Sequence, residues 1–203
     1  SATHFVTPVT FQALSGKRVF TNQWDPTVEN NMAHIELTRN SDVILIAPAS
    51  ADFLAKLANG FADDLLSTLS LARSCPLLVA PAMNKQMWES TATQRNINQL
   101  RADGVVILGP DNGSQACVEI GDGRMLEPDA LFHAIEHFFQ PKNLSGKHVL
   151  ITAGPTFEAI DTVRGITNSS SGKMGYSVAQ AAIEAGAEVT LISGPTTIAT
   201  PQN

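Results

Sequence analysis

Short apolar runs alternate with helical patterns along the whole chain. Strands of a parallel sheet need apolar side chains at nearly every position when both faces are covered. Five runs meet that requirement, at residues 42–47, 76–80, 105–108, 148–152 and 189–193. Helical spacing predicts helices over residues 8–15, 51–58, 62–72, 91–102, 129–139 and 173–185. This alternation is typical of an α/β fold with a doubly wound parallel sheet.

The ends of several predicted helices carry their own signals. Gly60, Gly104 and Gly186 each follow a helical run, where a glycine C-cap is favoured. Thr7-Pro8 supplies a cap and a first-turn proline, so the first helix begins almost at the first residue. Because a doubly wound domain usually opens with a strand, we expect the chain to begin inside a domain.

The polar, proline- and glycine-bearing stretch near residue 140 indicates a domain boundary. We predict a first domain at residues 1–140, a linker at 141–146 and the start of a second domain at 147–203. The second part contains one strand–loop–helix–strand unit, and two strands do not make an independent sheet. We therefore expect the second domain to be incomplete.

Composition narrows the class of protein. The 203 residues include 13 Lys and Arg against 19 Asp and Glu, a net charge of −6, with 43% hydrophobic residues. Without a basic cluster, binding to nucleic acid or an anionic membrane is not expected. Because no apolar run approaches the roughly 20 residues that span a bilayer, we expect a cytoplasmic protein. A reducing compartment then predicts that the two cysteines, Cys75 and Cys117, are free thiols.

In open parallel sheets, ligands bind beyond the carboxyl ends of the strands, and two loops there are unusual. Residues 48–52 (PASAD) expose backbone N–H groups before a helix, which suits an anion or a polar ring edge. The alternative is an ordinary turn with Ser50 as N-cap. In residues 81–88 (PAMNKQMW), Asn84 could donate to a carboxylate, with Met83, Met87 and Trp88 around an apolar pocket. Core packing and a helix cap are the alternative there.

Residues 109–125 contain four glycines and no periodicity, which predicts a long loop of the kind that forms binding flaps. Cys117 lies in this segment, so its thiol could be brought to a substrate, although a lone loop cysteine is more often incidental. Cys75, directly before a buried strand, is interpreted as a small core residue. His34 is either a base or a surface imidazole. No His or Cys pair has metal-ligand spacing, so no metal site is predicted.

In the second part, residues 168–175 (NSSSGKMG) open a helix, and their hydroxyls, glycines and lysine suit a phosphate. Thr167 and Met174 stand where a Walker A motif needs Gly and Ser or Thr, so this is not a P-loop. Residues 153–156 (AGPT) likewise lack the dinucleotide fingerprint, which argues against a nicotinamide-dependent dehydrogenase.

Taken together, these motifs resemble a known family. The sequences AHIEL around His34, APASAD at 47–52, PAMNKQMW at 81–88 and AC…GDGRM at 116–125 resemble the flavin-containing cysteine decarboxylases of coenzyme A synthesis. The sequences ITAGPT at 151–156 and NSSSGKMG resemble the start of a phosphopantothenate–cysteine ligase. In order along the whole chain, they resemble the bacterial bifunctional decarboxylase/ligases.

The resemblance implies a flavodoxin-like (Rossmann-type) domain that binds FMN at a trimer interface, often in a dodecamer, followed by the first βαβ unit of a second Rossmann-like domain. It implies FMN-dependent decarboxylation of 4′-phosphopantothenoylcysteine to 4′-phosphopantetheine. For the complete ligase it implies that 4′-phosphopantothenate and cysteine are joined using CTP and Mg²⁺. A decarboxylation needs an electron sink that side chains do not supply, which agrees with a cofactor.

The resemblance also implies roles for individual residues. It makes His34 the active-site histidine, Asn84 the amide that holds the substrate carboxylate, and Cys117 the proton donor of the closing step. The further positions that it implies are flavin contacts at Ser50, Ala51, Asp52, Phe53 and Ala82, substrate contacts at Met87, Arg124 and Met125, and ligase nucleotide contacts at Asn168, Ser170, Ser171, Gly172 and Lys173.

Three positions depart from the family pattern. Val118 and Glu119 follow Cys117 where the family has Gly-Asp, and Phe157 stands where the ligases have arginine. The strand and glycine-rich loop that open the family, and most of the ligase, have no counterpart in these residues. The alternative is a flavin-binding regulatory pseudoenzyme of the same fold, which loss of the catalytic residues would indicate. His34, Asn84 and Cys117 are all present, which favours the decarboxylase.

Overall fold

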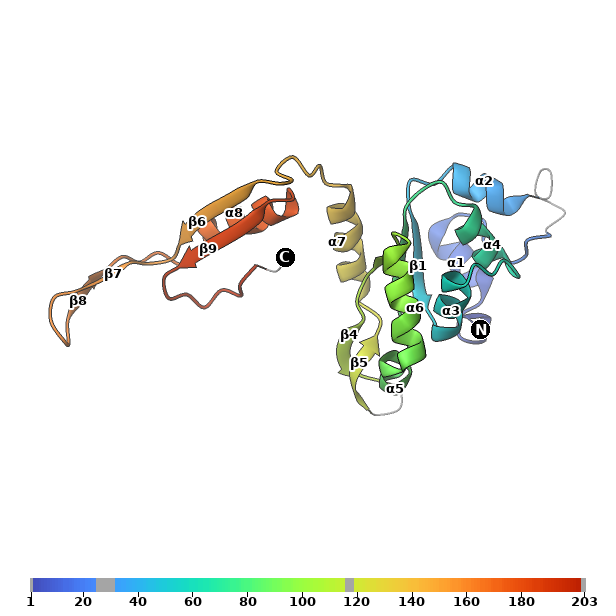
Figure 1. The fold of residues 1–203 in the computed structure, drawn as a ribbon, viewed down its shortest axis with the longest axis horizontal. Coiled ribbons are helices and arrows are strands. Elements are labelled where there is room, and N and C mark those ends of the chain that lie inside the picture. Colours follow the sequence, from blue (N-terminus) through green and yellow to red (C-terminus); the bar gives the residue numbers. More distant parts are fainter. Residues whose placement is uncertain (1, 25–31, 116–118, 202–203) are drawn as a thin grey trace. The chain divides into compact units, whose positions relative to one another are not determined.

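The computed structural model describes residues 2–24, 32–115 and 119–201. The chain divides into two compact units, residues 1–131 and residues 132–203, and each is described by itself. Figure 1 traces both units along the chain. The division falls inside helix α7 (Pro128–Phe139), whereas the linker predicted at 141–146 stays a prediction.

The first unit is built around a parallel sheet of three strands, β1 (Ile44–Ala49), β2 (Leu77–Pro81) and β3 (Val106–Ile107), in the order β1-β2-β3. Ile44 pairs with Leu77, and Leu78 pairs with Val106. The central strand β2 is buried at every position, as its continuous apolar run predicts. The predicted α/β fold with a parallel sheet is therefore confirmed.

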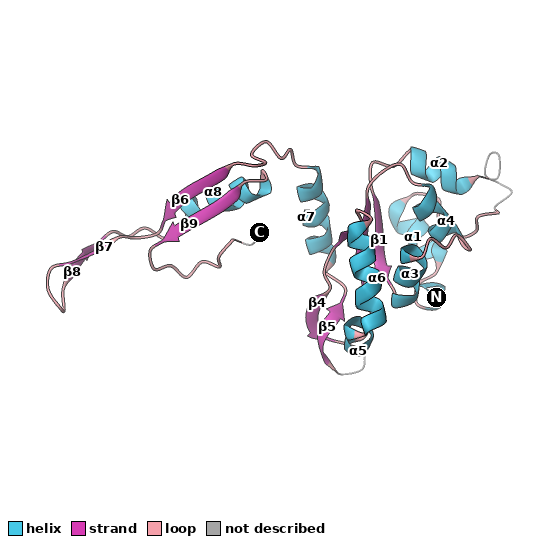
Figure 2. Ribbon diagram, in the orientation of Figure 1, coloured by secondary structure: helices cyan, strands magenta, loops and turns pink. Residues whose placement is uncertain are grey.

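Helices precede and connect these strands along the first unit (Figure 2). They are the short 3₁₀ helix η1 (Ala2–His4) and the helices α1 (Pro8–Ser15), α2 (Ala33–Arg39), α3 (Ala51–Ala58), α4 (Leu65–Ala72), α5 (Lys85–Glu89) and α6 (Thr91–Ala102). Gly60 and Gly104 follow α3 and α6 with φ of 70° and 80°, the left-handed conformation predicted for them. None of the described helices is long and apolar enough to cross a bilayer.

The core of the first unit lies between the sheet and helices α3 and α6. Leu54 of α3 and Ile97 of α6 are completely buried against Leu77 and Val79 of β2. Phe53, Leu100 and Val105 complete the same cluster, with Met83 and Trp88 packed at its edge. Cys75 is only half-buried and lies outside this cluster, so its interpretation as a core residue is wrong.

Residues 109–125 are not the continuous loop that their composition predicts. Strands β4 (Asp111–Ser114) and β5 (Ile120–Arg124) pair antiparallel in this segment. These strands cannot be predicted from the sequence, because they have neither apolar alternation nor β-branched enrichment. The residues that they bury are Gly121 and Gly123 rather than large side chains. Backbone pairing and docking, rather than residue propensity, form this hairpin.

Two helices of the first unit were not predicted. Helix α2 has seven residues and begins at Ala33, and its N-cap Met32 makes no side-chain cap bond, so its sequence carries no start signal. It packs on α4 and buries Ala33 and Thr38. Helix α5 has five residues, too few for periodicity to reveal. Both depend on tertiary packing.

In the second unit, β6 (His148–Ala153) and β9 (Glu188–Ser193) form a parallel pair on which α8 (Lys173–Glu184) packs. Strands β7 (Phe157–Ala159) and β8 (Gly165–Thr167) form a small antiparallel hairpin that was not predicted. In β6, residues 148, 150 and 152 are exposed while the alternate ones are half-buried. The expected coverage of both faces is therefore not seen for β6, because α8 packs on one face.

Candidate functional site

The carboxyl ends of β1 and β2 lie together, as expected of neighbouring parallel strands. The N–H of Ala82 donates to the carbonyl of Ala49 over 2.9 Å, which joins the two loops beyond the strands. Ser50 is the N-cap of α3, and its Oγ accepts from the N–H of Phe53 at 3.2 Å. The cap alternative considered for Ser50 is confirmed.

The four predicted flavin contacts beyond β1 therefore form the cap and first turn of one helix. Ser50 and Asp52 are exposed, whereas Phe53 points into the core and offers its backbone rather than its ring. The first N–H groups of a helix have no partner within it. The N–H groups of Ala51 and Asp52 fit the polar edge of a planar cofactor, and the small side chain of Ala82 fits its flat face.

Asn84 has a fixed amide orientation. It is the N-cap of α5, and its Oδ1 accepts from the N–H of Met87 at 2.9 Å. Its Nδ2, at the other end of the amide, donates to Oε1 of Gln86 at 2.9 Å. The helix cap considered as an alternative is confirmed. Because a primary amide has two N–H donors, the bond to Gln86 leaves one further donor on this half-buried side chain.

The β4–β5 hairpin docks against the Asn84 loop through backbone. The N–H of Met83 donates to the carbonyl of Gly123 at 2.9 Å. The strand register skips Gly123, which forms a bulge with φ of 130°. A Cβ atom at this position would lie 2.4 Å from the Met83 carbonyl oxygen, so only glycine permits this approach.

Docking of the hairpin leaves a cavity of about 420 Å³ beside Asn84. Its described lining residues are Ala82, Met83, Asn84, Ser114, Gln115, Gly123, Arg124 and Met125. The structure thus brings together four predicted site residues from two distant segments. Arg124 also pairs with Glu127. Met87 is 48% exposed and is not among the lining residues, so the structure does not place it with the other predicted substrate contacts.

Sequence reasoning missed Ser114, Gln115 and Gly123 of this cavity. Met83, for which the sequence leaves a pocket and the core as alternatives, contacts both. The density of glycines between 109 and 125 was the available signal for a close backbone approach. The polar residues Ser114 and Gln115 carry no signal of their own.

His34 does not lie with Asn84 within one chain. Helix α2 lies at the amino end of β1, and α5 lies beyond its carboxyl end (Figure 1). Nδ1 of His34 is buried and makes no hydrogen bond with the described residues. Cys117, with Val118, lies outside the described residues, and its described neighbours Gln115 and Glu119 are joined by a backbone hydrogen bond of 2.9 Å.

In the second unit, the predicted phosphate loop does open a helix. Gly172 is the N-cap of α8 with φ of 78°, and Lys173 is the first helical residue. Asn168 Oδ1 accepts from the N–H of Ser170 at 3.2 Å, which shapes the loop. A cavity of about 360 Å³ is lined by Ser170, Ser171, Pro195, Thr196 and Thr197. Two of the five predicted nucleotide contacts therefore line it.

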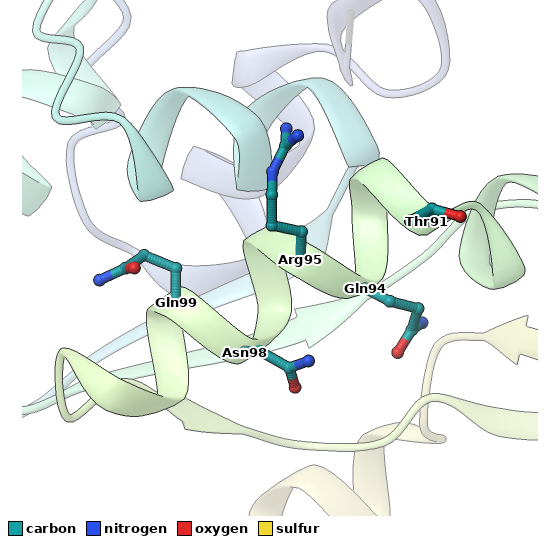
Figure 3. A pocket seen from close by; sticks show the side chains of 5 residues that line it. All are labelled: Thr91, Gln94, Arg95, Asn98 and Gln99. Carbon is teal, nitrogen blue, oxygen red and sulfur yellow. The ribbon is translucent and has the colours of Figure 1, made fainter.

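Another depression, on α6, does not have the character of a site. Thr91, Gln94, Arg95, Asn98 and Gln99 line it, and Figure 3 shows Arg95 pointing away from Gln94 and Asn98. Apart from the half-buried Gln94, these side chains are exposed, so they present no converging set of polar groups. Among the described residues, no group of three His, Cys, Asp or Glu side chains could hold a metal ion.

The groups with shifted pKa values lie outside the Asn84 cavity. A hydrogen bond from Lys56 lowers the pKa of Asp63, and the N–H of Val163 lowers the pKa of Asp161. Hydrogen bonds with the hydroxyls of Ser193 and Thr196 lower the pKa of Tyr176. Asp63 and its ion pair with Lys56 join α3 to the start of α4, which is a structural role.

Comparison with known proteins gives matches over both units. The Flavoprotein family model matches residues 1–140, and the model of the DNA/pantothenate metabolism flavoprotein C-terminal domain matches residues 144–203. The coenzyme A biosynthesis bifunctional protein CoaBC of Vibrio vulnificus is 55% identical over 203 residues. That alignment covers 100% of this chain and 51% of the relative, so the chain spans about half the length of such curated relatives.

Two solved structures are similar to the first part of the chain. A cysteine-to-serine mutant of a PPC decarboxylase, complexed with pantothenoylaminoethenethiol, is 34% identical with a TM-score of 0.57, covering 60% of this chain and 70% of that chain. The FMN-dependent cysteine decarboxylase SpaF is 39% identical with a TM-score of 0.53, covering 60% of this chain and 67% of that chain.

Proposed function

The chain belongs to the Flavoprotein family, with a flavodoxin-like α/β fold, and from this premise we propose that it carries an FMN-dependent decarboxylase of coenzyme A biosynthesis. Its substrate is 4′-phosphopantothenoylcysteine and its product is 4′-phosphopantetheine. The observation that carries the proposal is the cavity that Asn84, an amide with two N–H donors, lines together with β5 residues from a distant segment.

FMN is the cofactor in this proposal, and the residues beyond β1 and β2 fit it. The first turn of α3 offers backbone N–H groups, and Ala82 leaves room for a flat ring beside the Asn84 loop. When bound, FMN supplies the electron sink, because it can accept two electrons from the substrate thiol and later return them. Ser50, Ala51, Asp52, Phe53 and Ala82 would hold it.

The chain's own residues bind the substrate and move protons. Asn84 Nδ2 donates to the carboxylate that leaves as CO₂ and so orients the bond that breaks. Arg124 and Met125 contact the rest of the substrate from β5. Cys117 donates the proton that completes the product once CO₂ has left.

We propose that the working form is a homo-oligomer, a trimer or a dodecamer of cytoplasmic protein. Helix α2, which carries His34, and helix α5, which Asn84 caps, lie at opposite ends of β1. The buried Nδ1 of His34 has no partner among the described residues. A second copy would supply the active-site histidine to the cavity. This arrangement explains how a residue that is remote within one chain can serve the same reaction.

Flavin binding and CO₂ release test the proposal directly. We expect the protein to take up FMN and show the flavin absorption bands, and then to release CO₂ from 4′-phosphopantothenoylcysteine. A protein that binds FMN without releasing CO₂ would instead be the flavin-binding regulatory pseudoenzyme. A protein that takes up no FMN would contradict both functions.

We further propose that the second unit belongs to a ligase that joins 4′-phosphopantothenate to cysteine using CTP and Mg²⁺. The cavity lined by Ser170 and Ser171 supports this, since hydroxyls and helix N–H groups suit a triphosphate. Asn168, Gly172 and Lys173 complete the proposed nucleotide loop.

A pair of glycine variants tests the nucleotide loop. A Cβ at Gly172 would lie 2.8 Å from Cγ2 of Thr196, whereas Gly146, with a similar φ of 73°, has open space around it. We expect Gly172→Ala to weaken Mg²⁺–CTP binding by about tenfold, or 1.4 kcal/mol, in calorimetric titration. Gly146→Ala has the same backbone strain and should leave binding unchanged. Equal affinities in both variants would contradict this nucleotide loop.

A further inference from the structure

The two walls of the Asn84 cavity come from segments about 30 to 40 residues apart in the chain. One wall is the loop 82–84 before α5, and the other is the β4–β5 hairpin. The backbone bond between Met83 and Gly123 joins them at one point. One side-chain attachment beside it is exposed, since Nε2 of Gln86 in α5 donates to Oε1 of Glu119 next to β5 at 3.3 Å.

The side chain of Gln115 supplies a second attachment. Its Oε1 accepts from the N–H of Lys85 at 3.0 Å, and its Nε2 donates to the carbonyl of Asp122 at 3.1 Å. Lys85 directly follows Asn84, and Asp122 lies two residues before Arg124. One half-buried amide therefore bonds to the backbone on both walls, next to the two polar side chains that face the cavity.

The two hydrogen bonds made by residue 115 require an amide side chain. The N–H of Lys85 is in the first turn of α5 and has no acceptor within the helix, so Gln115 satisfies it. A primary amide can accept at one end and donate at the other, which a carboxylate or a hydrocarbon of similar size cannot do. Gly121, whose Cβ would lie 2.5 Å from Cδ of Lys85, lets β5 approach closely enough for the bonds to form.

We propose that Gln115 is a positioning residue for the decarboxylation, an inference that rests on the function proposed above. By bonding to Lys85 and Asp122 it holds the hairpin against the first turn of α5, and so sets the distance between Asn84 and Arg124 across the cavity. It acts on substrate binding through these two side chains and does not itself take part in proton transfer.

Gln115→Met tests this, because it keeps the volume of the side chain and removes both hydrogen bonds. In the FMN-loaded protein we expect KM for 4′-phosphopantothenoylcysteine to rise about tenfold with kcat changed much less, since two neutral hydrogen bonds are lost. Hydrogen exchange at the Lys85 amide should become faster. Gln99→Met is the matched control, since Gln99 bonds to Asp103 at 2.8 Å on an exposed face of α6.

Each outcome decides the inference. Unchanged KM or unchanged exchange at Lys85 in Gln115→Met would overturn it. Loss of FMN would overturn it too, because Gln115 would then belong to the cofactor site or the fold. If a decarboxylated species two hydrogens lighter than 4′-phosphopantetheine accumulates, Gln115 acts in the proton donation assigned to Cys117. That result would also overturn the inference. If the unsubstituted protein releases no CO₂, the proposed function fails, while the exchange measurement still tests the attachment itself.

Discussion

Asn84→Asp should reduce kcat/KM for decarboxylation by at least about 100-fold while the protein keeps its fold and its FMN. Aspartate caps a helix as well as asparagine does, so its carboxylate still accepts from the N–H of Met87 and α5 still begins at Lys85. The Nδ2 donor is replaced by an acceptor. A negative charge then faces the carboxylate of the substrate, where a hydrogen bond was formed before.

The size of this effect follows from the loss of a donor together with a new repulsion. Removing one preorganised donor typically costs about 10²–10³ in rate, and two like charges at contact repel each other. Steady-state kinetics, flavin absorbance and circular dichroism measure the three expected results. Asn98→Asp, on an exposed face of α6, introduces the same change away from the cavity and should leave kcat/KM unchanged.

The result would be different if Asn84 served only as a helix cap. Asn84→Asp would then retain full activity, because the cap is preserved. Full activity in this variant would therefore remove Asn84 from substrate binding, whatever other variants show. Alanine is less informative here, since it removes both the cap and the donor.

Cys117→Ser should still release CO₂ but yield almost none of the normal product. The oxidised and decarboxylated substrate is an enethiol, which needs a hydride equivalent (two electrons and one proton) and one further proton to become 4′-phosphopantetheine. A thiol has a pKa of about 8.5 in model peptides, and a serine hydroxyl is a far weaker acid that cannot donate this proton near neutral pH. The enethiol, two hydrogens lighter than the product, should accumulate.

Mass spectrometry of the reaction measures both species at once. Cys75→Ser is the matched control, because Cys75 is a half-buried thiol before β2 and outside the cavity. It should give the normal product at the normal rate. A normal yield of 4′-phosphopantetheine from Cys117→Ser would show that this thiol is not the proton donor.

The regular elements of this protein could be predicted because their signals are local. Apolar runs revealed β1, β2, β3, β6 and β9, and helical periodicity with terminal glycines revealed α3, α6 and α8 within one to two residues. Such elements follow from the side chains of consecutive residues. The α/β class and the parallel sheet follow from their alternation along the chain.

The elements that were missed are those without a local signal. Helix α2 is short, uncapped and stabilised by packing on α4. The β4–β5 hairpin is held by backbone bonds and by glycines that allow close approach, such as Gly123. Propensity favours neither element, so their formation depends on residues distant in the sequence.

The candidate site divides in the same way. The residue types at Ser50, Asn84 and Arg124 follow from motifs that can be recognised in the sequence alone. The orientation of the Asn84 amide follows from the cap that it forms on α5, and the placement of Arg124 at the same cavity follows from the docking of the hairpin at Gly123. A linear pattern specifies which chemical groups are present, whereas their relative placement depends on hydrogen bonds between segments that meet only in the folded chain.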